Sequence, residues 1–252
     1  MTRFNKDIIK IESLTSTNDF AKELLSQKMP KADITSIEAS EQTKGRGQKG
    51  NYWESEPGKN LTISLIVKPV TVKPEQQFYL SMTVSLAIGS CLSRFVDNVF
   101  IKWPNDIYIN NKKICGILIE NTLLNQSITT AIIGIGLNVN QIIFSSSIPN
   151  PTSLRKEKNT VFDLEEVKSL FFDRFDHYYG MLTDGLFSEI HEEYLNYLYL
   201  KERTGMFKDA DGVFKGTINT VNTKGLIEIV KQDTETKQYA FKEVQYLLQT
   251  MV

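Results

Sequence analysis

A glycine-rich cationic segment between Gly45 and Gly50, of sequence GRGQKG, contains the first residues suited to binding an anion. Glycines let the backbone approach a ligand closely, and their N–H groups can surround a negative charge. Arg46 can bind a carboxylate or phosphate through two hydrogen bonds, and Lys49 adds a point charge. The spacings of a Walker loop and of a dinucleotide fingerprint are absent. The alternative is a flexible surface loop with incidental charge.

A second segment, KWPND at Lys102–Asp106, is followed by KICGILIE at Lys113–Glu120. Pro104 would interrupt a central strand, so we expect a bend that leaves Asn105 and Asp106 at a strand edge. A lysine that enters an apolar strand can hold an anion while its stem packs. The alternatives are a turn at Asn105 and Asp106, and a solubilising edge lysine at position 113.

Alternating glycines interrupt a third, apolar segment, Ile133–Asn140. Gly134 and Gly136 would leave space above a sheet, as if a flat ligand lay against the backbone. Asn138 could hydrogen-bond a nucleobase. Bulges or close strand packing, with Asn138 at a strand end, are the alternatives.

Other chemistries have little support in the sequence. His177 and His191 lie in helical stretches with no partnered serine or cysteine motif, so a histidine triad is unsupported. Cys91 and Cys115 lie in apolar segments without metal-ligand spacing, and we interpret them as reduced core thiols.

Strands and helices alternate irregularly around these segments. Small polar residues at positions 16–18 are expected to cap a first helix. Asn110-Asn111 is a tight-turn signal between two strands, so a purely parallel sheet is excluded. The predicted strands are Asp7–Glu12, Ile34–Ala39, Leu61–Val67, Val99–Trp103, Asp106–Ile109, Ile114–Glu120 and Ile128–Asn140. The predicted helices begin near Phe20 and span Pro74–Phe95, Phe162–Leu182 and Leu186–Leu200, with loops at 41–60 and 141–160.

The composition changes after Lys201, where short β-prone runs alternate with Asp-Gly and Lys-Gly turns. These runs are Val213–Val221, Leu226–Val230 and Tyr239–Leu248. We therefore predict a larger α+β domain over residues 1–200 and a small β-barrel over residues 201–252.

Composition and charge restrict the class of protein. The 252 residues carry a formal net charge of -1, which gives no support for a nucleic-acid partner. The first ten residues lack the apolar run of a signal peptide, and no stretch approaches the ~20 apolar residues of a membrane span. The expected location is the cytoplasm, away from any membrane.

Taken together and in order, the motifs resemble the biotin–protein ligase family. The resemblance covers about residues 10–140 and includes Ser16-Thr17-Asn18, Glu41–Gly47, Tyr52-Trp53, Lys102–Asp106, Lys113–Glu120 and Gly134–Asn138. It implies a mixed or antiparallel sheet with flanking helices, as in class II synthetases, and a C-terminal SH3-like β-barrel.

The resemblance also implies a two-step reaction. The carboxylate of biotin attacks the α-phosphate of ATP, supplied with Mg²⁺, and biotinyl-5′-AMP and pyrophosphate form. A lysine of a biotin carboxyl carrier protein domain, part of a carboxylase, then takes the biotinyl group and releases AMP. By position, Arg46 and Lys113 would stabilise negative charge, and Asp106 would orient or deprotonate the incoming lysine. No metal ligand from the protein is assigned.

The family pattern further assigns binding roles by position. Trp53, Ile117 and Leu118 would form an apolar slot with the two alternating glycines. The residues that would contact biotin are Ser16, Thr17, Asn18, Gln42, Gly45, Arg46, Gly47, Gln48, Trp53, Lys113, Gly116, Leu118, Gly134 and Gly136. Those that would contact ATP are Arg46, Lys49, Asn105 and Asn138.

Two departures from the repressor-type members of the family bear on function. Some of them carry arginine where this chain has Gln48, so a charge is missing from the loop that covers the adenylate. Only fifteen residues precede Ser16, too few for a winged-helix domain, so we expect a ligase that does not bind DNA. Both homodimers and monomers occur in the family. A lipoate ligase or transferase of the same fold, and an inert binding module, are the alternative functions.

Overall fold

The computed structural model describes residues 3–124, 127–232 and 235–247, without the side chain of Lys49. Its larger sheet has seven strands in the order β1-β2-β3-β7-β6-β5-β4. These strands are β1 (Lys6–Leu14), β2 (Ile34–Gln42), β3 (Leu61–Val67), β4 (Val99–Lys102), β5 (Asp106–Ile109), β6 (Lys112–Leu124) and β7 (Ser127–Leu137). Only β1 and β2 pair in parallel, which confirms the predicted mixed sheet.

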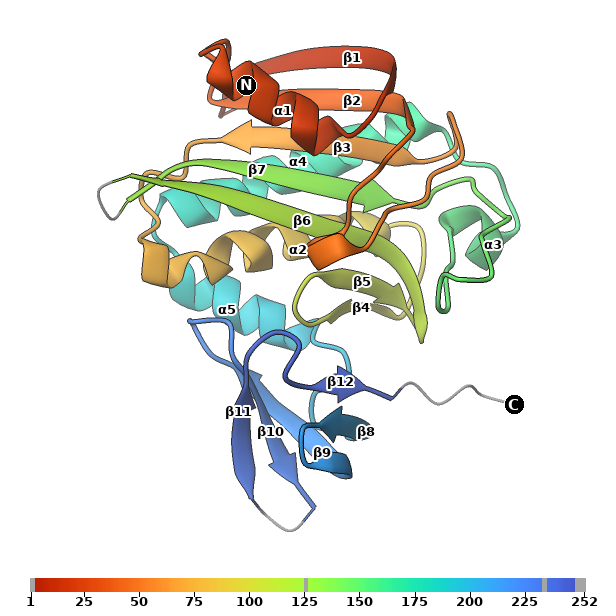
Figure 1. The fold of residues 1–252 in the computed structure, drawn as a ribbon, viewed down its shortest axis with the longest axis vertical. Helices are drawn as coiled ribbons and strands as arrows, with labels where there is room; N and C mark the ends of the chain where they lie inside the picture. Colours follow the sequence, from red (N-terminus) through yellow and green to blue (C-terminus); the bar gives the residue numbers. More distant parts are fainter. Residues whose placement is uncertain (1–2, 125–126, 233–234, 248–252) are drawn as a thin grey trace.

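Helices cover both faces of this sheet. Helix α1 (Thr17–Ser26) lies in front of it in Figure 1, whereas α2 (Phe78–Leu92), α4 (Leu164–Thr183) and α5 (Phe187–Asn196) lie behind it. The predicted loops contain short helices, η1 (Gln48–Gly50) and α3 (Leu154–Lys158), and a further turn, η2 (Pro74–Gln76), precedes α2. No helix in the described ranges is both long and apolar enough to cross a membrane.

The two-residue period of the central strands divides the core between the two faces. In β3, Ile63 and Leu65 point to one face and join the main core beneath α2 and α4. Their neighbours Ser64 and Ile66 point the other way, and Ile66 packs beneath α1. Because side chains alternate along a strand, one face of the sheet is filled with aliphatic residues while the α1 face can carry polar groups.

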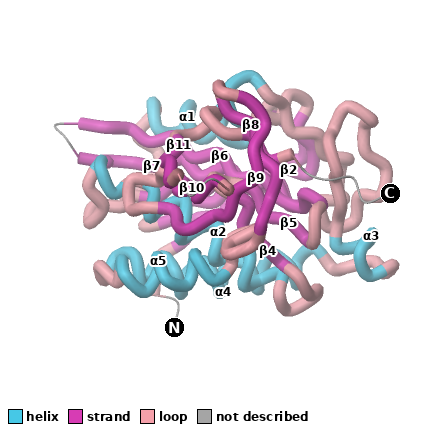
Figure 2. The backbone as a smooth tube through the Cα atoms, turned by 90° about the horizontal axis from the view of Figure 1, so that it is seen from below, coloured by secondary structure: helices cyan, strands magenta, loops and turns pink. Residues whose placement is uncertain are grey.

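The C-terminal part forms a second, five-stranded sheet in the order β11-β10-β9-β8-β12, which we call the C-terminal sheet. Its strands are β8 (Thr204–Asp209), β9 (Gly212–Val221), β10 (Ile227–Lys231), β11 (Thr236–Tyr239) and β12 (Gln245–Tyr246). Seen from below, these strands lie across the end of the molecule that carries β4 and α5 (Figure 2).

The small C-terminal β domain that we predicted is present, but its described strands do not close into a barrel. The C-terminal sheet is open, because its terminal strands β11 and β12 are only four and two residues long and pair with β10 and β8, not with each other. The strand predicted over Tyr239–Leu248 is instead broken by a turn, where Lys242 has a φ of 74°. Leu248 lies outside the described residues. The domain boundary at residue 200 stays a prediction.

A buried ion pair connects helix α4 to strand β2 of the larger sheet. Lys168 Nζ on α4 lies 2.8 Å from Glu38 Oε2 on β2, and each side chain is 11% exposed. Burial acts to lower the pKa of Lys168, but hydrogen bonds to Glu165 and Glu38 outweigh it and raise the pKa. The lysine is therefore charged, and its removal leaves Glu38 without its cation.

Lys168→Met is expected to reduce the free energy of unfolding by about 3 kcal/mol, because a buried carboxylate loses its counter-ion. Urea denaturation measures this loss. Lys10→Met is the matched control, since Lys10 is 63% exposed and pairs with Glu165 at 3.6 Å. Equal losses of unfolding free energy in the two variants would show that the buried pair matters no more for stability than the exposed one.

Candidate functional site

A cavity of about 730 Å³ opens on the α1 face of the sheet, between that helix and the C-terminal sheet. Its walls come from the start of α1, the loop after β2, the strands β5, β6 and β7, and the turn before β12. The predicted site residues that line it are Ser16, Thr17, Asn18, Gln42, Arg46, Gly47, Gln48, Trp53, Asn105, Asp106, Lys113, Gly116, Ile117, Leu118, Gly134 and Gly136.

Two predicted residues lie elsewhere, and the side chain of a third is not described. Gly45 lines a neighbouring cavity, together with Gln42 and Trp53. Asn138 is 3% exposed, does not line either cavity, and donates from Nδ2 to the carbonyl of Thr152. The side chain of Lys49 lies outside the described part of the structure.

Hydrogen bonds fix the polar end of the cavity at the start of α1. Gln42 Oε1 accepts from the backbone N–H of Thr17 at 2.8 Å, so Gln42 caps the helix and Ser16, contrary to expectation, makes no side-chain cap. Ser64 Oγ lies 2.7 Å from Thr17 Oγ1 and 2.6 Å from Asn18 Oδ1. This network holds buried polar groups in one arrangement, as a site for a polar ligand requires.

Glycines of β6 and β7 make room for two of the cavity's side chains. A Cβ atom at Gly134 would lie 2.3 Å from Asn18 Oδ1, and one at Gly136 would lie 2.3 Å from the Trp53 ring. The space above these glycines therefore holds Asn18 and Trp53, and not a bare backbone surface as we expected. Gly116 and Gly136 pair across β6 and β7, so both lie beneath Trp53.

The expected apolar slot is also smaller than predicted. The side chain of Ile117 belongs to the main core on the opposite face, because it alternates with Gly116 and Leu118 along β6. Its backbone pairs with Asn105, whose Nδ2 donates to the Ile117 carbonyl at 2.6 Å. Asn105 thus connects the bend after Pro104 to β6 as well as lining the cavity.

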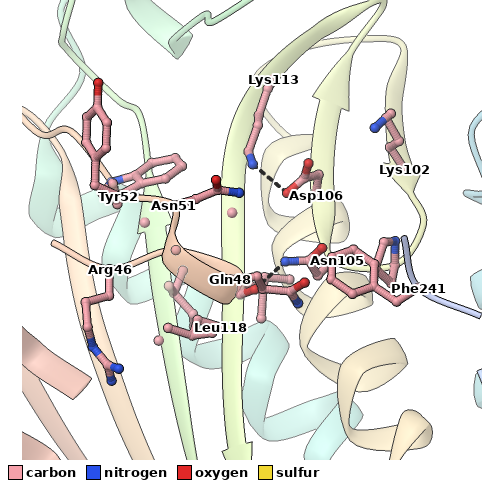
Figure 3. A pocket seen from close by; sticks show the side chains of 18 of the residues that line it. Arg46, Gln48, Asn51, Tyr52, Lys102, Asn105, Asp106, Lys113, Leu118 and Phe241 are labelled. Atoms are coloured by element: carbon pink, nitrogen blue, oxygen red, sulfur yellow. Dashed lines mark hydrogen bonds and ion pairs between the residues drawn. The ribbon is translucent and has the colours of Figure 1, made fainter. Parts of the chain in front are cut away.

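An ion pair lies at the centre of the cavity. Lys113 Nζ is 2.6 Å from Asp106 Oδ1, and the ammonium also lies 5.8 Å from the centroid of the Trp53 ring. The antiparallel pairing of β5 with β6 brings the two residues together across the turn at Asn110-Asn111. Figure 3 shows the pair pointing into the cavity, as the motifs predicted.

Arg46 points away from this pair (Figure 3). Its Nη2 lies 2.7 Å from Glu120 Oε2 and 3.0 Å from Asp19 Oδ1. The expectation that Arg46 and Lys113 flank one point is therefore not met in this conformation, because two carboxylates hold the guanidinium on the α1 side.

Glu120 lines the neighbouring cavity and contacts the polar network of α1, although the sequence motifs did not single it out. Burial acts to raise its pKa, but hydrogen bonds from Lys22 and Asn18 and the charge of Arg46 outweigh burial and lower the pKa. Its carboxylate accepts from Asn18 Nδ2 at 2.9 Å and thereby joins the polar network to the cationic loop. Glu120 lies two residues from Leu118 and four from Gly116 along β6, so it shares their face of the sheet. This spacing could have identified it from the sequence.

Several buried polar atoms at the cavity have no hydrogen-bond partner among the described residues. They include Trp53 Nε1, Gln48 Oε1 and Arg46 Nε. An unpaired buried polar group costs about 1–3 kcal/mol, so native structures keep few of them. Other such atoms lie away from the cavity, but these three are placed where a ligand in the cavity could pair with them.

The cavity favours anions. Arg46, Lys102, Lys113 and Lys242 line it, whereas Asp106 is the one carboxylate among its described lining residues. The described part of the chain contains no group of three or more histidine, cysteine or acidic side chains arranged to hold a metal ion.

Comparisons with known proteins identify the family of the chain. A model of the biotin/lipoate A/B protein ligase family matches residues 10–138, just over half of the chain. The bifunctional ligase/repressor BirA of Bacillus subtilis is 37% identical over 135 residues, which are 53% of this chain and 41% of that protein. The biotin–protein ligase 1 of Arabidopsis thaliana is 26% identical over 242 residues, 92% of this chain and 65% of that protein.

A solved structure extends the similarity to nearly the whole fold. The biotin protein ligase of Aquifex aeolicus, in complex with biotin and ATP, superposes with a TM-score of 0.79 over 95% of this chain and 98% of that one, at 24% identity. At this sequence identity the structural similarity shows a shared fold alone. The chain spans less than two thirds of the curated relatives named above. With the family match over residues 10–138, these findings show that the chain belongs to the biotin/lipoate A/B protein ligase family.

Proposed function

We propose that this protein is an ATP-dependent biotin–protein ligase, which forms biotinyl-5′-AMP and transfers biotin to a lysine of a carrier protein. The observation that carries the proposal is the position of the Lys113–Asp106 pair and the polar network of α1 in one cavity. Such a cavity can bind a ligand with a polar ring at one end and an anion at the other.

In the proposed complex, the ureido ring of biotin lies against the polar network at the start of α1. That ring presents two donors and one acceptor, and Ser16, Thr17 and Asn18 carry matching groups at this end of the cavity. A site built from hydrogen bonds rejects analogues that leave those groups unpaired. Trp53 and Leu118 form the apolar wall along the ring and chain.

The activation step needs positive charge where two anions meet. The carboxylate of biotin attacks the α-phosphorus of ATP, and Lys113 is placed to stabilise the negative charge at that point. Arg46 must leave Glu120 and Asp19 to take part, and the triphosphate, which as a whole carries more charge than one carboxylate, competes for the guanidinium. Gly45 and Gly47 allow the loop to change conformation.

The transfer step requires an unprotonated lysine from the carrier. Asp106 faces the same cavity, so its carboxylate is placed to orient that lysine or accept its proton. Biotin and the carrier lysine supply the nucleophiles in turn. No serine or cysteine of the chain has to become one.

Several further assignments belong to this proposal. The acceptor is a biotin carboxyl carrier protein domain of a carboxylase. A relative from Paracoccus denitrificans, 27% identical over 62% of this chain and 68% of that protein, is named biotin–[acetyl-CoA-carboxylase] ligase. Mg²⁺ enters with ATP. The cytoplasmic location, the absence of DNA binding and a homodimer stay predictions.

Pyrophosphate release on addition of biotin and MgATP tests the function. We expect release with biotin and none with lipoate, followed by labelling of a carrier domain. Labelling with lipoate alone would favour a lipoate ligase of the same family. Release with neither ligand, from folded protein, would favour a binding module.

Arg46→Ala and Lys113→Ala are each expected to slow adenylate formation about a hundredfold, because each removes a cation that stabilises the transition state. Pyrophosphate exchange measures this rate, and thermal unfolding monitors the fold. Lys112→Ala is the matched control, because Lys112 neighbours Lys113 but pairs with Glu157 at the surface. Near-normal pyrophosphate exchange in both alanine variants would contradict the proposed roles of Arg46 and Lys113 in adenylate formation.

Gly136→Ala is expected to weaken biotin binding at least about tenfold, because its Cβ atom would overlap the Trp53 ring and displace it. Calorimetric titration with biotin measures the affinity. Gly89→Ala serves as control, since its Cβ would meet Tyr197 at 3.5 Å, an ordinary contact. Unchanged affinity in Gly136→Ala would show that the position of Trp53 does not matter for biotin.

A further inference from the structure

Four oxygen atoms lie in series at the polar end of the cavity, and we call them the oxygen chain. Gln42 Oε1 is 3.1 Å from Thr17 Oγ1, which is 2.7 Å from Ser64 Oγ. Ser64 Oγ is in turn 2.6 Å from Asn18 Oδ1. Ser64 is fully buried, and Thr17 and Asn18 are 4% and 3% exposed. The hydrogen bonds of the oxygen chain are therefore largely shielded from water and strong.

Both ends of the oxygen chain can only accept hydrogen bonds. At one end the backbone N–H of Thr17, which can only donate, points at Gln42 Oε1 from 2.8 Å and so fixes the orientation of that amide. At the other end Asn18 Nδ2 donates to the Glu120 carboxylate at 2.9 Å. Because Nδ2 faces Glu120, Asn18 turns its carbonyl oxygen toward Ser64.

Glu120 is held as a charged acceptor at its place in β6. Lys22 Nζ and Arg46 Nη2 lie 2.8 and 2.7 Å from its carboxylate. Burial acts to raise its pKa, but these cations and the hydrogen bond from Asn18 outweigh burial and lower the pKa. An ionised carboxylate has no hydrogen to donate, so the Asn18 amide cannot reverse without facing two acceptors toward each other.

The oxygen chain has fewer hydrogens than contacts. The hydroxyls of Thr17 and Ser64 bring one hydrogen each, whereas the chain contains three oxygen–oxygen contacts. If Thr17 turned its hydrogen toward a ligand, a second contact would lack a hydrogen, and oxygen atoms this close repel each other without one. Thr17 therefore meets a ligand as an acceptor only.

This restriction has a consequence for the ligand. Thr17 lines the cavity, so a ligand group that lies against its hydroxyl meets a lone pair. An N–H at that point gains a hydrogen bond, whereas an ether or carbonyl oxygen would leave two buried acceptors facing each other. Ser64 and Glu120 do not line this cavity and act on the ligand through Thr17 and Asn18.

We propose that Ser64 and Glu120 are positioning residues that determine specificity, because they keep both hydrogens inside the oxygen chain and so make the cavity select a ring that offers an N–H to Thr17. This inference rests on the proposed ligase function, in which that ring is the ureido ring of biotin.

Two analogues of biotin test the selection. In each, a different one of the two ring N–H groups is replaced by an oxygen atom, which gives a cyclic carbamate. Calorimetric titration measures the dissociation constants. Wild-type protein is expected to bind the carbamate whose oxygen faces Thr17 at least about a hundredfold more weakly than biotin, because a site built to pair an N–H rejects a ligand without it.

Ser64→Ala removes the two shortest contacts of the oxygen chain, so the Thr17 hydroxyl is free to turn. The preference for biotin over that carbamate is expected to fall about tenfold, since Thr17 can then donate to the ring oxygen. The preference over the other carbamate stays at the wild-type value. In adenylate formation, KM for biotin rises more than kcat falls, because the residue acts on binding.

Glu120→Gln lets the Asn18 amide reverse, since a glutamine can donate to Asn18 Oδ1. Asn18 Nδ2 then supplies the oxygen chain with a further hydrogen, and the preference is expected to fall about as far as in Ser64→Ala. Lys22→Met is the control, because it removes a cation from the same carboxylate but leaves the oxygen chain intact.

Thr62→Val is the control for Ser64→Ala. Thr62 lies two residues from Ser64 on the same face of β3, is 2% exposed, and donates its hydroxyl to the Ala39 carbonyl outside the oxygen chain. We expect the wild-type preference among the three ligands in this variant.

Three results would overturn the inference alone. They are equal binding of biotin and both carbamates by wild-type protein, an unchanged preference in Ser64→Ala or Glu120→Gln, and an equal change toward both carbamates. A wild-type protein that neither binds biotin nor releases pyrophosphate with biotin and MgATP would instead overturn the proposed function, and this inference with it.

Discussion

The antiparallel pairing of β6 with β7 is the constraint on which the site depends. Gly116 pairs with Gly136, and Leu118 pairs with Gly134, so all four positions share one face of the sheet. A shift of one residue would exchange that face with the aliphatic one, and it would place isoleucines under Trp53 and Asn18. The burial of Ile117, Ile133 and Ile135 in the main core opposes such a shift, and the same core therefore determines where the polar groups stand.

The principal charged side chains on this face of the sheet form ion pairs. Arg46 with Glu120, and Lys113 with Asp106, keep the two principal cations in defined places without a ligand. A partly buried ion pair changes its geometry readily only if a competing partner offers comparable compensation, and phosphates do so. The pairs therefore position these two cations before a ligand binds, while Lys102 lies against the rings of Tyr108 and Tyr246.

Local signals in the sequence predicted the parts of the fold that depend on local patterns. The strands Leu61–Val67 and Asp106–Ile109 have the predicted bounds, because their apolar runs end at clear polar residues. The wrongly predicted elements depend on long-range contacts or have weak sequence patterns. The strand β11 reads TKQY and has no apolar alternation, and the turn at Lys242 depends on Glu243, whose carboxylate accepts from the N–H of Ala240. The motifs identified the cavity's residues, but the partners of Arg46 and the approach of Tyr246 to Lys102 arise only when distant segments meet.

The unpaired polar atoms of Trp53, Gln48 and Arg46 explain why such a site needs a well-packed support. At about 1–3 kcal/mol for each buried group without a partner, they offset much of the stability that a domain retains. Burial of the main core on the opposite side of the sheet compensates for this cost. A ligand that pairs those atoms recovers their cost on binding, so the same atoms that weaken the free protein contribute to affinity and selectivity for the ligand. The division of the sheet into an aliphatic face and a polar face is what allows both demands to be met in one fold.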